Sequence, residues 1–251
     1  IHVDKDFVIS LDIKNFFPSI TERLVNQIFR KAGMGEAPAK LLSELCTYKF
    51  FVPQGALTSP KISNIVAAST FGPEIHEMCM RLGLTLSIYA DDITISGNNQ
   101  PTEAGDPAQT YNFGEIISEV TTIVRKYGFN INREKTKVMR PFQRQWVCGA
   151  VVNSQVNLVN FERLKLRAIV HNCETNGVEV EAQKSGLDTL TFVRKYAGKL
   201  NWFYQLNPEK ARPLCQRFKK ITGPLVKMHP AFDIDPLAYS SSIEDLSSNL
   251  N

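Results

Sequence analysis

Two adjacent carboxylates, Asp91 and Asp92, form the stretch of this sequence with the clearest chemical potential. Within residues 84–96, apolar and polar residues alternate on both sides of the pair, a period of two that predicts two strands. Hairpin turns usually carry Asn-Gly or a similar pair, whereas two neighbouring carboxylates repel unless a cation or a proton neutralises them. The pair therefore predicts a site for a hard divalent cation such as Mg²⁺. A solvated turn is the alternative interpretation.

A third carboxylate, Asp12, lies in an apolar segment, residues 7–13, that predicts a buried strand. Burying a carboxylate is costly unless it is paired or metal-bound. If this strand lies beside the predicted hairpin, Asp12, Asp91 and Asp92 gather at one sheet edge and can hold two Mg²⁺ ions about 3.5–4 Å apart. Such a pair activates a hydroxyl and stabilises departing pyrophosphate, which is the chemistry of phosphoryl transfer.

The composition indicates a soluble globular protein. The chain has 251 residues, of which 43% are hydrophobic and 22% charged, enough for one large domain or two smaller ones. No apolar run approaches the roughly 18 residues of a membrane span, so we expect no membrane partner. The five cysteines are scattered and odd in number, which predicts reduced thiols in a cytoplasmic protein rather than disulfides or a zinc site. They are Cys46, Cys79, Cys148, Cys173 and Cys215.

Charge is distributed unevenly and predicts three segments. Residues 1–155 carry 16 Lys and Arg against 15 Asp and Glu, whereas residues 156–229 carry 13 against 6. The Ser-rich tail, residues 230–251, carries 4 acidic residues and no Lys or Arg, and we expect it to be partly disordered. A basic segment beside a carboxylate-bearing one indicates a polyanion held by the first and acted on by the second. A solvated helical surface would give the same charge excess.

Helix and strand signals complete the expected order of elements. Ser19 and Glu22 fit a capping box for a helix through residue 31, and Ser59 fits the N-cap of a long helix to about residue 81. Asn207 before Pro208 predicts the start of the last helix. The other expected elements are a surface loop at 97–108, a helix at 112–127, a strand at 145–153, and helices at 160–175 and 186–205.

Four segments, in order, resemble successive motifs of reverse transcriptases. They are Phe-Val-Ile-Ser-Leu-Asp-Ile-Lys-Asn-Phe-Phe-Pro-Ser at 7–19, Pro-Gln-Gly-Ala-Leu-Thr-Ser-Pro at 53–60, Tyr-Ala-Asp-Asp at 89–92 and Asn-Arg-Glu-Lys-Thr at 132–136. The resemblance implies an RNA-directed DNA polymerase of the α+β class. Its right-hand palm, an antiparallel sheet with packed helices, would span 1–155 and be followed by an α-helical, basic thumb over 156–229. Because the chain begins without Met, we expect the fingers to precede Ile1 and to be largely missing.

The end of the palm and the thumb are similar to those of bacterial retron reverse transcriptases. The similarity lies in Val-Cys-Gly at 147–149, Val-Val-Asn at 151–153 and the stretch 198–209, with departures at Leu57 and Cys148, where retron enzymes usually have Pro and Thr. It implies copying of a cognate structured noncoding RNA into DNA (msDNA) from dNTPs, commonly in antiphage defence with an effector protein. Other bacterial reverse transcriptases, of the group II intron, diversity-generating or abortive-infection type, are alternatives. A noncatalytic RNA-binding scaffold with a polymerase fold is another.

The resemblance also implies roles for individual residues. Asp12, Asp91 and Asp92, with the Ile13 carbonyl, would bind two Mg²⁺ ions, for which Mn²⁺ is a possible substitute. Lys135, rather than Lys137, would donate a proton to pyrophosphate, although a solvated lysine is equally compatible with the sequence. The resemblance further implies contacts with substrates. Phe17 would exclude a ribose 2′-hydroxyl, unless it is a core residue like Phe16. Gln54 and Gly55 would contact the nucleotide. The residues that would contact primer and template are Tyr89, Trp146, Cys148, Gly149, Lys195 and Lys199.

Overall fold

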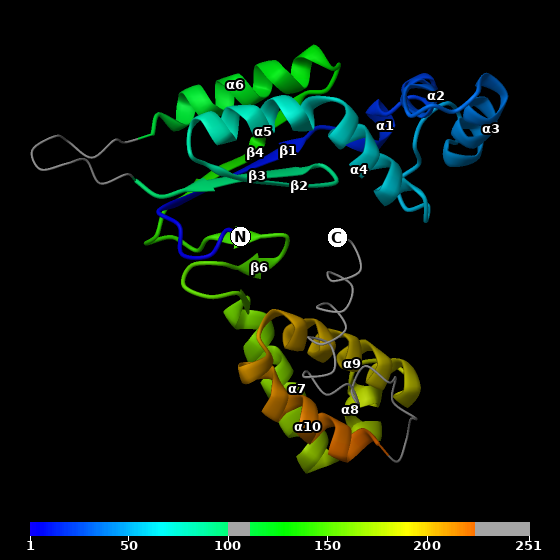
Figure 1. Ribbon diagram of the computed structural model, residues 1–251. Coiled ribbons are helices and arrows are strands. Elements are labelled where there is room, and N and C mark those ends of the chain that lie inside the picture. Colours follow the sequence, from blue (N-terminus) through cyan, green and yellow to red (C-terminus); the bar gives the residue numbers. More distant parts are fainter. Residues whose placement is uncertain (100–110, 224–251) are drawn as a thin grey trace, which may run out of the picture. The chain divides into compact units, whose positions relative to one another are not determined.

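The computed structural model describes residues 1–99 and 111–223 (Figure 1). The chain divides into two compact units, Ile1–Gln155 and Val156–Asn251, which are considered separately below. The predicted tail at 230–251 lies outside the described residues, as does most of the loop predicted at 97–108. The predicted α+β class, an antiparallel sheet with packed helices followed by a helical segment, is confirmed.

The first unit is built on a four-stranded antiparallel sheet with the strand order β2-β3-β1-β4. The apolar segment that predicts the first strand forms β1, at the bounds expected. Its neighbours come from distant parts of the sequence, so the sheet depends on long-range pairing rather than on one local meander. The strands are β1 (Phe7–Ile13), β2 (Thr85–Tyr89), β3 (Asp92–Gly97) and β4 (Ile131–Met139).

The two faces of this sheet differ in polarity because side chains alternate along each strand. Phe7, Ile9, Leu11 and Ile13 of β1 belong to the main hydrophobic core. Helices α5 (Phe71–Arg81) and α6 (Phe113–Lys126) cover this apolar face and contribute to the same core (Figure 1). Asp12 therefore points to the opposite face, where it is not enclosed by these helices.

The helices that follow β1 correct the predicted capping box. The chain forms a short α1 (Phe16–Ser19) and then α2 (Glu22–Lys31), whose N-cap is Thr21 rather than Ser19. The Thr21 hydroxyl oxygen accepts a hydrogen bond from the Leu24 amide at 3.2 Å, while the Ser19 hydroxyl donates to the Asn15 carbonyl at 2.8 Å. Ser19 is already the last residue of a helical turn and is therefore unable to begin the next one. Helix α3 (Glu36–Cys46) follows.

The long helix predicted from Ser59 to about residue 81 is wrong, because the structure contains two helices. Helix α4 (Ser59–Ser69) and α5 are separated by Thr70, whose backbone leaves the helical region with φ −127° and ψ −104°. Pro73 explains the break, since it has no amide proton and its ring would clash with the carbonyl four residues earlier. Ser59 is not the N-cap either; its buried hydroxyl donates to the Pro53 carbonyl at 2.5 Å.

The segment 145–153 forms a hairpin instead of the predicted single strand. Strands β5 (Trp146–Val147) and β6 (Ala150–Val151) pair in antiparallel fashion around Cys148 and Gly149. Both turn residues have positive φ, 48° and 82°, as a type I′ turn requires. Gly149 was the signal in the sequence that could have indicated this turn.

Over its described residues, 156–223, the second unit contains β7 (Asn157–Leu158) and four helices around their own core. The Asn207 side chain accepts a hydrogen bond from the Lys210 amide at 3.1 Å, which confirms the predicted start of the last helix. Leu166, Phe192 and Phe218 are among the fully enclosed side chains of this core. The helices are α7 (Asn160–Asn176), α8 (Val178–Lys184), α9 (Thr189–Leu206) and α10 (Pro208–Thr222).

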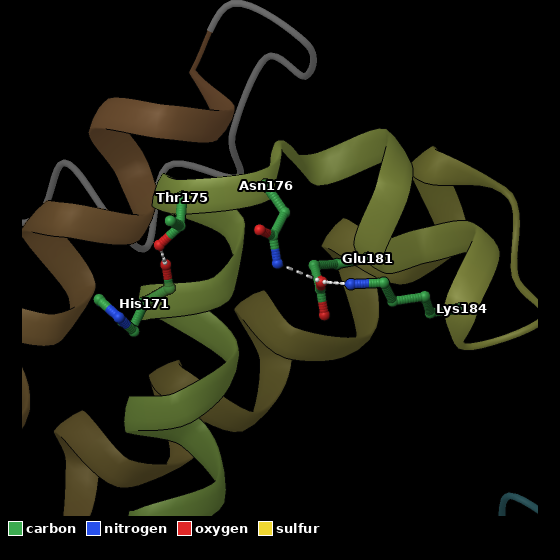
Figure 2. Close-up of polar contacts among 5 residues, drawn as sticks. All are labelled: His171, Thr175, Asn176, Glu181 and Lys184. Atoms are coloured by element: carbon green, nitrogen blue, oxygen red, sulfur yellow. Dashed lines mark hydrogen bonds and ion pairs between the residues drawn. The ribbon is translucent and has the colours of Figure 1, made fainter.

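The end of α7 agrees with the predicted helix at 160–175, whereas α8 was not predicted. The corner between the two helices is closed by a buried carboxylate (Figure 2). Glu181 accepts hydrogen bonds from Asn176 at 3.0 Å and from Lys184 at 2.7 Å. These two donors lower the pKa of Glu181, the Lys184 bond having the larger effect. Gly177, with φ +90°, allows the chain to reverse between the helices.

Candidate active site

The register of the sheet brings Asp12 and Asp92 together. In the antiparallel pairing of β1 with β3, Asp12 lies directly opposite Asp92, and directly opposed side chains share one face of a sheet. Asp91 lies in the hairpin turn, directly before Asp92. Its backbone carbonyl accepts a hydrogen bond from the Ile13 amide at 2.9 Å. This bond ties the turn to the end of β1, so all three aspartates belong to one end of the sheet.

The turn between β2 and β3 has an unusual backbone. Tyr89 pairs with Asp92, which leaves only Ala90 and Asp91 to reverse the chain. Ala90 has φ +50°, a left-handed value that a residue with a Cβ rarely adopts. Strain of this kind is retained where the surrounding structure enforces it, and it is frequent at functional sites. The side chain of Tyr89 is exposed next to this turn.

Lys135 supplies a positive charge to the aspartates. The pairing of β1 with β4 shifts register between Ser10 and Asp12, so the part of β4 that contains Lys135 bulges. The Lys135 ammonium nitrogen lies 2.7 Å from the Asp12 Oδ1 atom, and the hydrogen bond and charge of Asp12 raise the pKa of Lys135. The charges of Asp91 and Asp92 act in the same direction but less strongly.

Asp92 lies in surroundings that disfavour its negative charge. Burial raises the pKa of Asp92 above its ordinary value, and the charges of Asp91 and Asp12 raise it further, against a smaller opposing effect of Lys135. In residues 1–99 and 111–223, no group of three or more His, Cys, Asp or Glu side chains is arranged to hold a metal ion. The donors nevertheless suit a hard cation, because they are carboxylate oxygens in partly buried positions, and among the described side chains the Lys135 ammonium pairs with Asp12 alone.

Of the residues predicted to contact a nucleotide, Phe17 lies on the helix that follows β1, and Gln54 and Gly55 lie in the loop before α4. Phe17, in α1, is half-buried and packs against the main core, while the neighbouring Phe16 is fully buried, as expected for a core residue. Asn15, with φ +51°, reverses the chain between β1 and α1. Gln54 and Gly55 are exposed. A Cβ at Gly55 would meet no atom within 4 Å, although its φ of +94° favours glycine.

Three of the residues predicted to contact primer and template, Trp146, Cys148 and Gly149, are on the β5–β6 hairpin. Burial raises the pKa of the Cys148 thiol, and the charge of Asp92 adds to this effect, so the turn lies within electrostatic reach of the aspartates. The Trp146 ring is exposed, with the Lys137 ammonium 5.1 Å from its centroid. Gly149 completes the turn.

Two buried polar residues that the sequence did not reveal support this arrangement. His2 bridges the hairpin that carries the aspartates, with ring nitrogens 2.7 Å from the hydroxyls of Ser87 on β2 and Ser96 on β3. Gln145 donates to the carbonyl of Lys5 at 2.8 Å and holds the start of β5 to the N-terminal segment. Neither residue belongs to a recognisable motif, so no sequence signal could have identified them.

Lys195 and Lys199, predicted to contact nucleic acid, belong to α9 in the second unit. Lys199 forms an ion pair with Glu162 at 3.0 Å, and the Lys195 ammonium lies 5.8 Å from the centroid of the Tyr196 ring. Both are therefore held at the surface of this unit, and Lys199 has a carboxylate partner that a phosphate would have to replace.

Known proteins share this sequence pattern over most of the chain. The chain is 33% identical over 236 residues to the Retron Mx65 reverse transcriptase of Myxococcus xanthus, covering 87% of this chain and 50% of the relative. It is 30% identical over 172 residues to the Retron Ec86 reverse transcriptase of Escherichia coli, covering 68% of this chain and 50% of the relative. The chain thus spans about half the length of these curated relatives.

A solved structure of telomerase from Candida albicans overlaps 95% of this chain and 49% of its own, with 10% identity and a TM-score of 0.49. The family model described as reverse transcriptase (RNA-dependent DNA polymerase) matches residues 2–219. A match over that length, together with the retron relatives, places the chain in the reverse transcriptase family.

Proposed function

We propose that the protein is an RNA-directed DNA polymerase of the retron type, and that this chain supplies its palm and thumb. The observation that carries the proposal is the register that sets Asp12 opposite Asp92, with Asp91 adjoining, in a chain of the reverse transcriptase family. Residues 1–155 would form the palm and residues 156–229 the thumb. The division of the structure into two units after Gln155 supports this assignment.

Asp12, Asp91 and Asp92, with the Ile13 carbonyl, would hold two Mg²⁺ ions, and Mn²⁺ is a possible substitute. When bound, the ions would activate the primer hydroxyl and neutralise charge at the departing pyrophosphate. Lys135 would act as the proton donor to pyrophosphate. A lysine is protonated at neutral pH, and the ammonium of Lys135 already lies at Asp12, which raises its pKa. Release of Lys135 from Asp12 would lower that pKa and make the proton easier to transfer.

The segments around this cluster would position the substrates. Phe17 would restrict the space below the sugar and favour deoxynucleotides, while Gln54 and the open backbone at Gly55 would contact the nucleotide. Tyr89 would support the primer end. The hairpin at 146–149, with Trp146, Cys148 and Gly149, would hold the primer strand, as its electrostatic link to Asp92 supports.

The helical unit would hold the RNA–DNA hybrid by its backbone and A-form shape rather than by its sequence. Lys195 and Lys199 are proposed phosphate contacts. The substrates would be dNTPs and a cognate structured noncoding RNA, and the product would be msDNA. Similarity to two retron reverse transcriptases supports the retron type. We further propose that the protein acts in the cytoplasm, in antiphage defence, with an effector protein. Among the described residues, no helix is both long enough and apolar enough to cross a bilayer.

Primer extension by the full-length protein with its RNA, dNTPs and Mg²⁺ tests the catalytic proposal. A protein carrying Asp91→Asn and Asp92→Asn is expected to lose DNA synthesis while still binding RNA. The matched control is Glu134→Gln, which removes an exposed carboxylate close to Lys135 in the sequence. Normal synthesis by the double variant would refute the proposed site, and RNA binding without synthesis by the wild type would favour a noncatalytic scaffold.

The nucleic acid that copurifies with the protein tests the retron assignment. Sequencing it is expected to yield one structured RNA joined to DNA copied from it, with a covalent RNA–DNA branch. Intron RNA, or DNA unrelated to a dedicated noncoding RNA, would instead support the group II intron, diversity-generating or abortive-infection type.

A further inference from the structure

A strained turn between α3 and α4 displays aromatic side chains. Tyr48 and Phe51 exchange backbone hydrogen bonds of 2.8 and 3.2 Å and so enclose a two-residue turn. The two central residues, Lys49 and Phe50, both have left-handed backbones, with φ of 49° and 68°. Type I′ turns require this geometry, and Asn-Gly is the usual choice because a Cβ is unfavourable there. We refer to residues 48–51 as the aromatic turn.

The aromatic turn holds apolar surface in solvent. Tyr48 is 66% exposed and Phe50 73% exposed, so the rings contribute little to the core that the turn adjoins. The Lys49 ammonium lies 5.4 Å from the centroid of the Tyr48 ring, which places a positive charge beside an exposed aromatic face. A bulky ring on a strained backbone and exposed to solvent does not contribute to the stability of the fold.

Next to the aromatic turn is an open cavity of about 420 Å³ whose lining joins rings to basic side chains. Phe50 and Phe51 form one part of the lining, and Arg23, Arg30 and Lys40 contribute three positive charges. Glu22 and Glu36 also line it, and Arg30 approaches Glu36 only at 3.9 Å. Lys40 also approaches Glu44 at 4.0 Å, so with Lys49 the surface carries four basic side chains against three acidic ones. Arg23 forms no ion pair in the described part of the chain.

We propose that the aromatic turn and this cavity bind single-stranded RNA. Bases would stack on Phe50 and Tyr48, and Arg23, Lys40 and Lys49 would contact phosphates, the combination by which proteins hold single strands without regard to sequence. Aromatic and arginine side chains are also enriched at protein–protein interfaces, but lysine is depleted there. Lys40 and Lys49 beside the rings therefore favour a polyanion over a protein partner. Helices α2 and α3 extend from the end of the sheet that carries the β2–β3 turn (Figure 1). This surface thus extends the proposed function with a second site for nucleic acid. Binding of RNA to it requires no catalysis.

Replacing Phe50 by Gly tests the proposal, because the affinity for RNA should fall while the stability of the fold is maintained or raised. Glycine accepts a φ of +68° without strain, so the melting temperature should be maintained or raised. Loss of one stacked base should weaken binding of a single-stranded oligouridylate of about 12 nucleotides by about 5- to 150-fold. Phe142→Ala is the matched control, since Phe142 is 81% exposed on the same unit and lies outside the proposed surface.

Fluorescence anisotropy on the 251-residue chain carrying Asp91→Asn and Asp92→Asn keeps this test independent of polymerase activity. Ultraviolet crosslinking followed by mass spectrometry should place the uridine adduct on the peptide containing the aromatic turn. Arg23→Gln should weaken binding and reduce its salt dependence by about one phosphate contact. Wild-type affinity of Phe50→Gly with no adduct at the turn would overturn the proposal. A change of the chain from dimer to monomer on Phe50→Gly, measured by light scattering, would overturn it in favour of contact between copies.

Discussion

Replacing Asp92 by Asn is expected to abolish DNA synthesis and, in the absence of metal, to stabilise the folded protein. Burial and the charges of Asp91 and Asp12 raise the pKa of Asp92 in the folded state. The folded protein therefore binds this proton more tightly than the unfolded chain, whose Asp pKa is about 3.9. Stability from this group is present at low pH and is lost as pH rises through the raised pKa. At neutral pH the charged carboxylate is thus unfavourable, and an uncharged Asn removes that cost.

The magnitude follows from the pairing of Asp12 with Asp92. Directly opposed residues in an antiparallel pair have Cα atoms about 4.5–5.5 Å apart. Two like charges at about this separation repel by roughly 1–3 kcal/mol at dielectric constants between those of a protein surface and water. Solvent exposure and the ammonium of Lys135 reduce the net gain for Asp92→Asn to about 1 kcal/mol. For a chain of this size, that gain raises the melting temperature by about 2–4 °C.

Thermal unfolding measures this change in melting temperature. The buffer contains a chelator, and the experiment is done at neutral pH and at pH values near the unfolded Asp pKa. Asp92→Asn should melt above the wild type at neutral pH, and the difference should vanish in acid. Glu134→Gln, which removes one exposed carboxylate near the site, should leave the melting temperature unchanged. If Asp92→Asn melts below the wild type at neutral pH, or matches Glu134→Gln, the three carboxylates do not form a repelling cluster and the reasoning fails.

Three further predictions concern other parts of the fold. Lys135→Met should slow single-turnover nucleotide incorporation by about 10²–10⁴-fold with little change in nucleotide KM; an unchanged rate would show that another group donates the proton. Burial lowers the pKa of His2 from 6.5 to about 4, so stability should fall as pH decreases through this interval while the unfolded chain takes up the proton. His2→Ala should flatten that dependence in thermal unfolding, and an unaltered acid limb would contradict the assignment. Gly72→Ala should destabilise by about 1–3 kcal/mol in denaturant, because its Cβ would lie 2.7 Å from a backbone carbonyl oxygen. Gly198→Ala, with no atom within 4 Å, should stabilise by about 1 kcal/mol, and the reverse order would refute this interpretation.

Local patterns in the sequence predicted an element correctly where its structure depends only on residues that are close together in the chain. The apolar run at 7–13 forms β1, the Asn112 side chain begins α6, and Asn207 with Pro208 begins α10. In each case the signal lies in residues that are neighbours in the sequence. The structure they favour needs no contact with a distant segment. The carboxylate pair at 91–92 was also visible, because its charge is unfavourable in an ordinary turn.

Predictions failed where neighbouring signals competed. Ser19 and Thr21 could both cap a helix, and the short turn of α1 settled the choice in favour of Thr21. A small, apolar helix signal continued across Thr70, although Pro73 required a break. At Cys148, two consecutive left-handed residues turned an apparent strand into a hairpin.

What the sequence by itself indicated is three aspartates and the strands at 7–13 and 84–96 that carry them, whereas Lys135 became a candidate only through the family resemblance. Only the tertiary structure decided that Asp12 lies opposite Asp92, because strand register depends on side chains that meet from distant segments. It also decided that a bulge in β4 brings Lys135 to Asp12 and that His2 joins the strands of the hairpin. Such contacts form when the core packs, so no local pattern of residues encodes them.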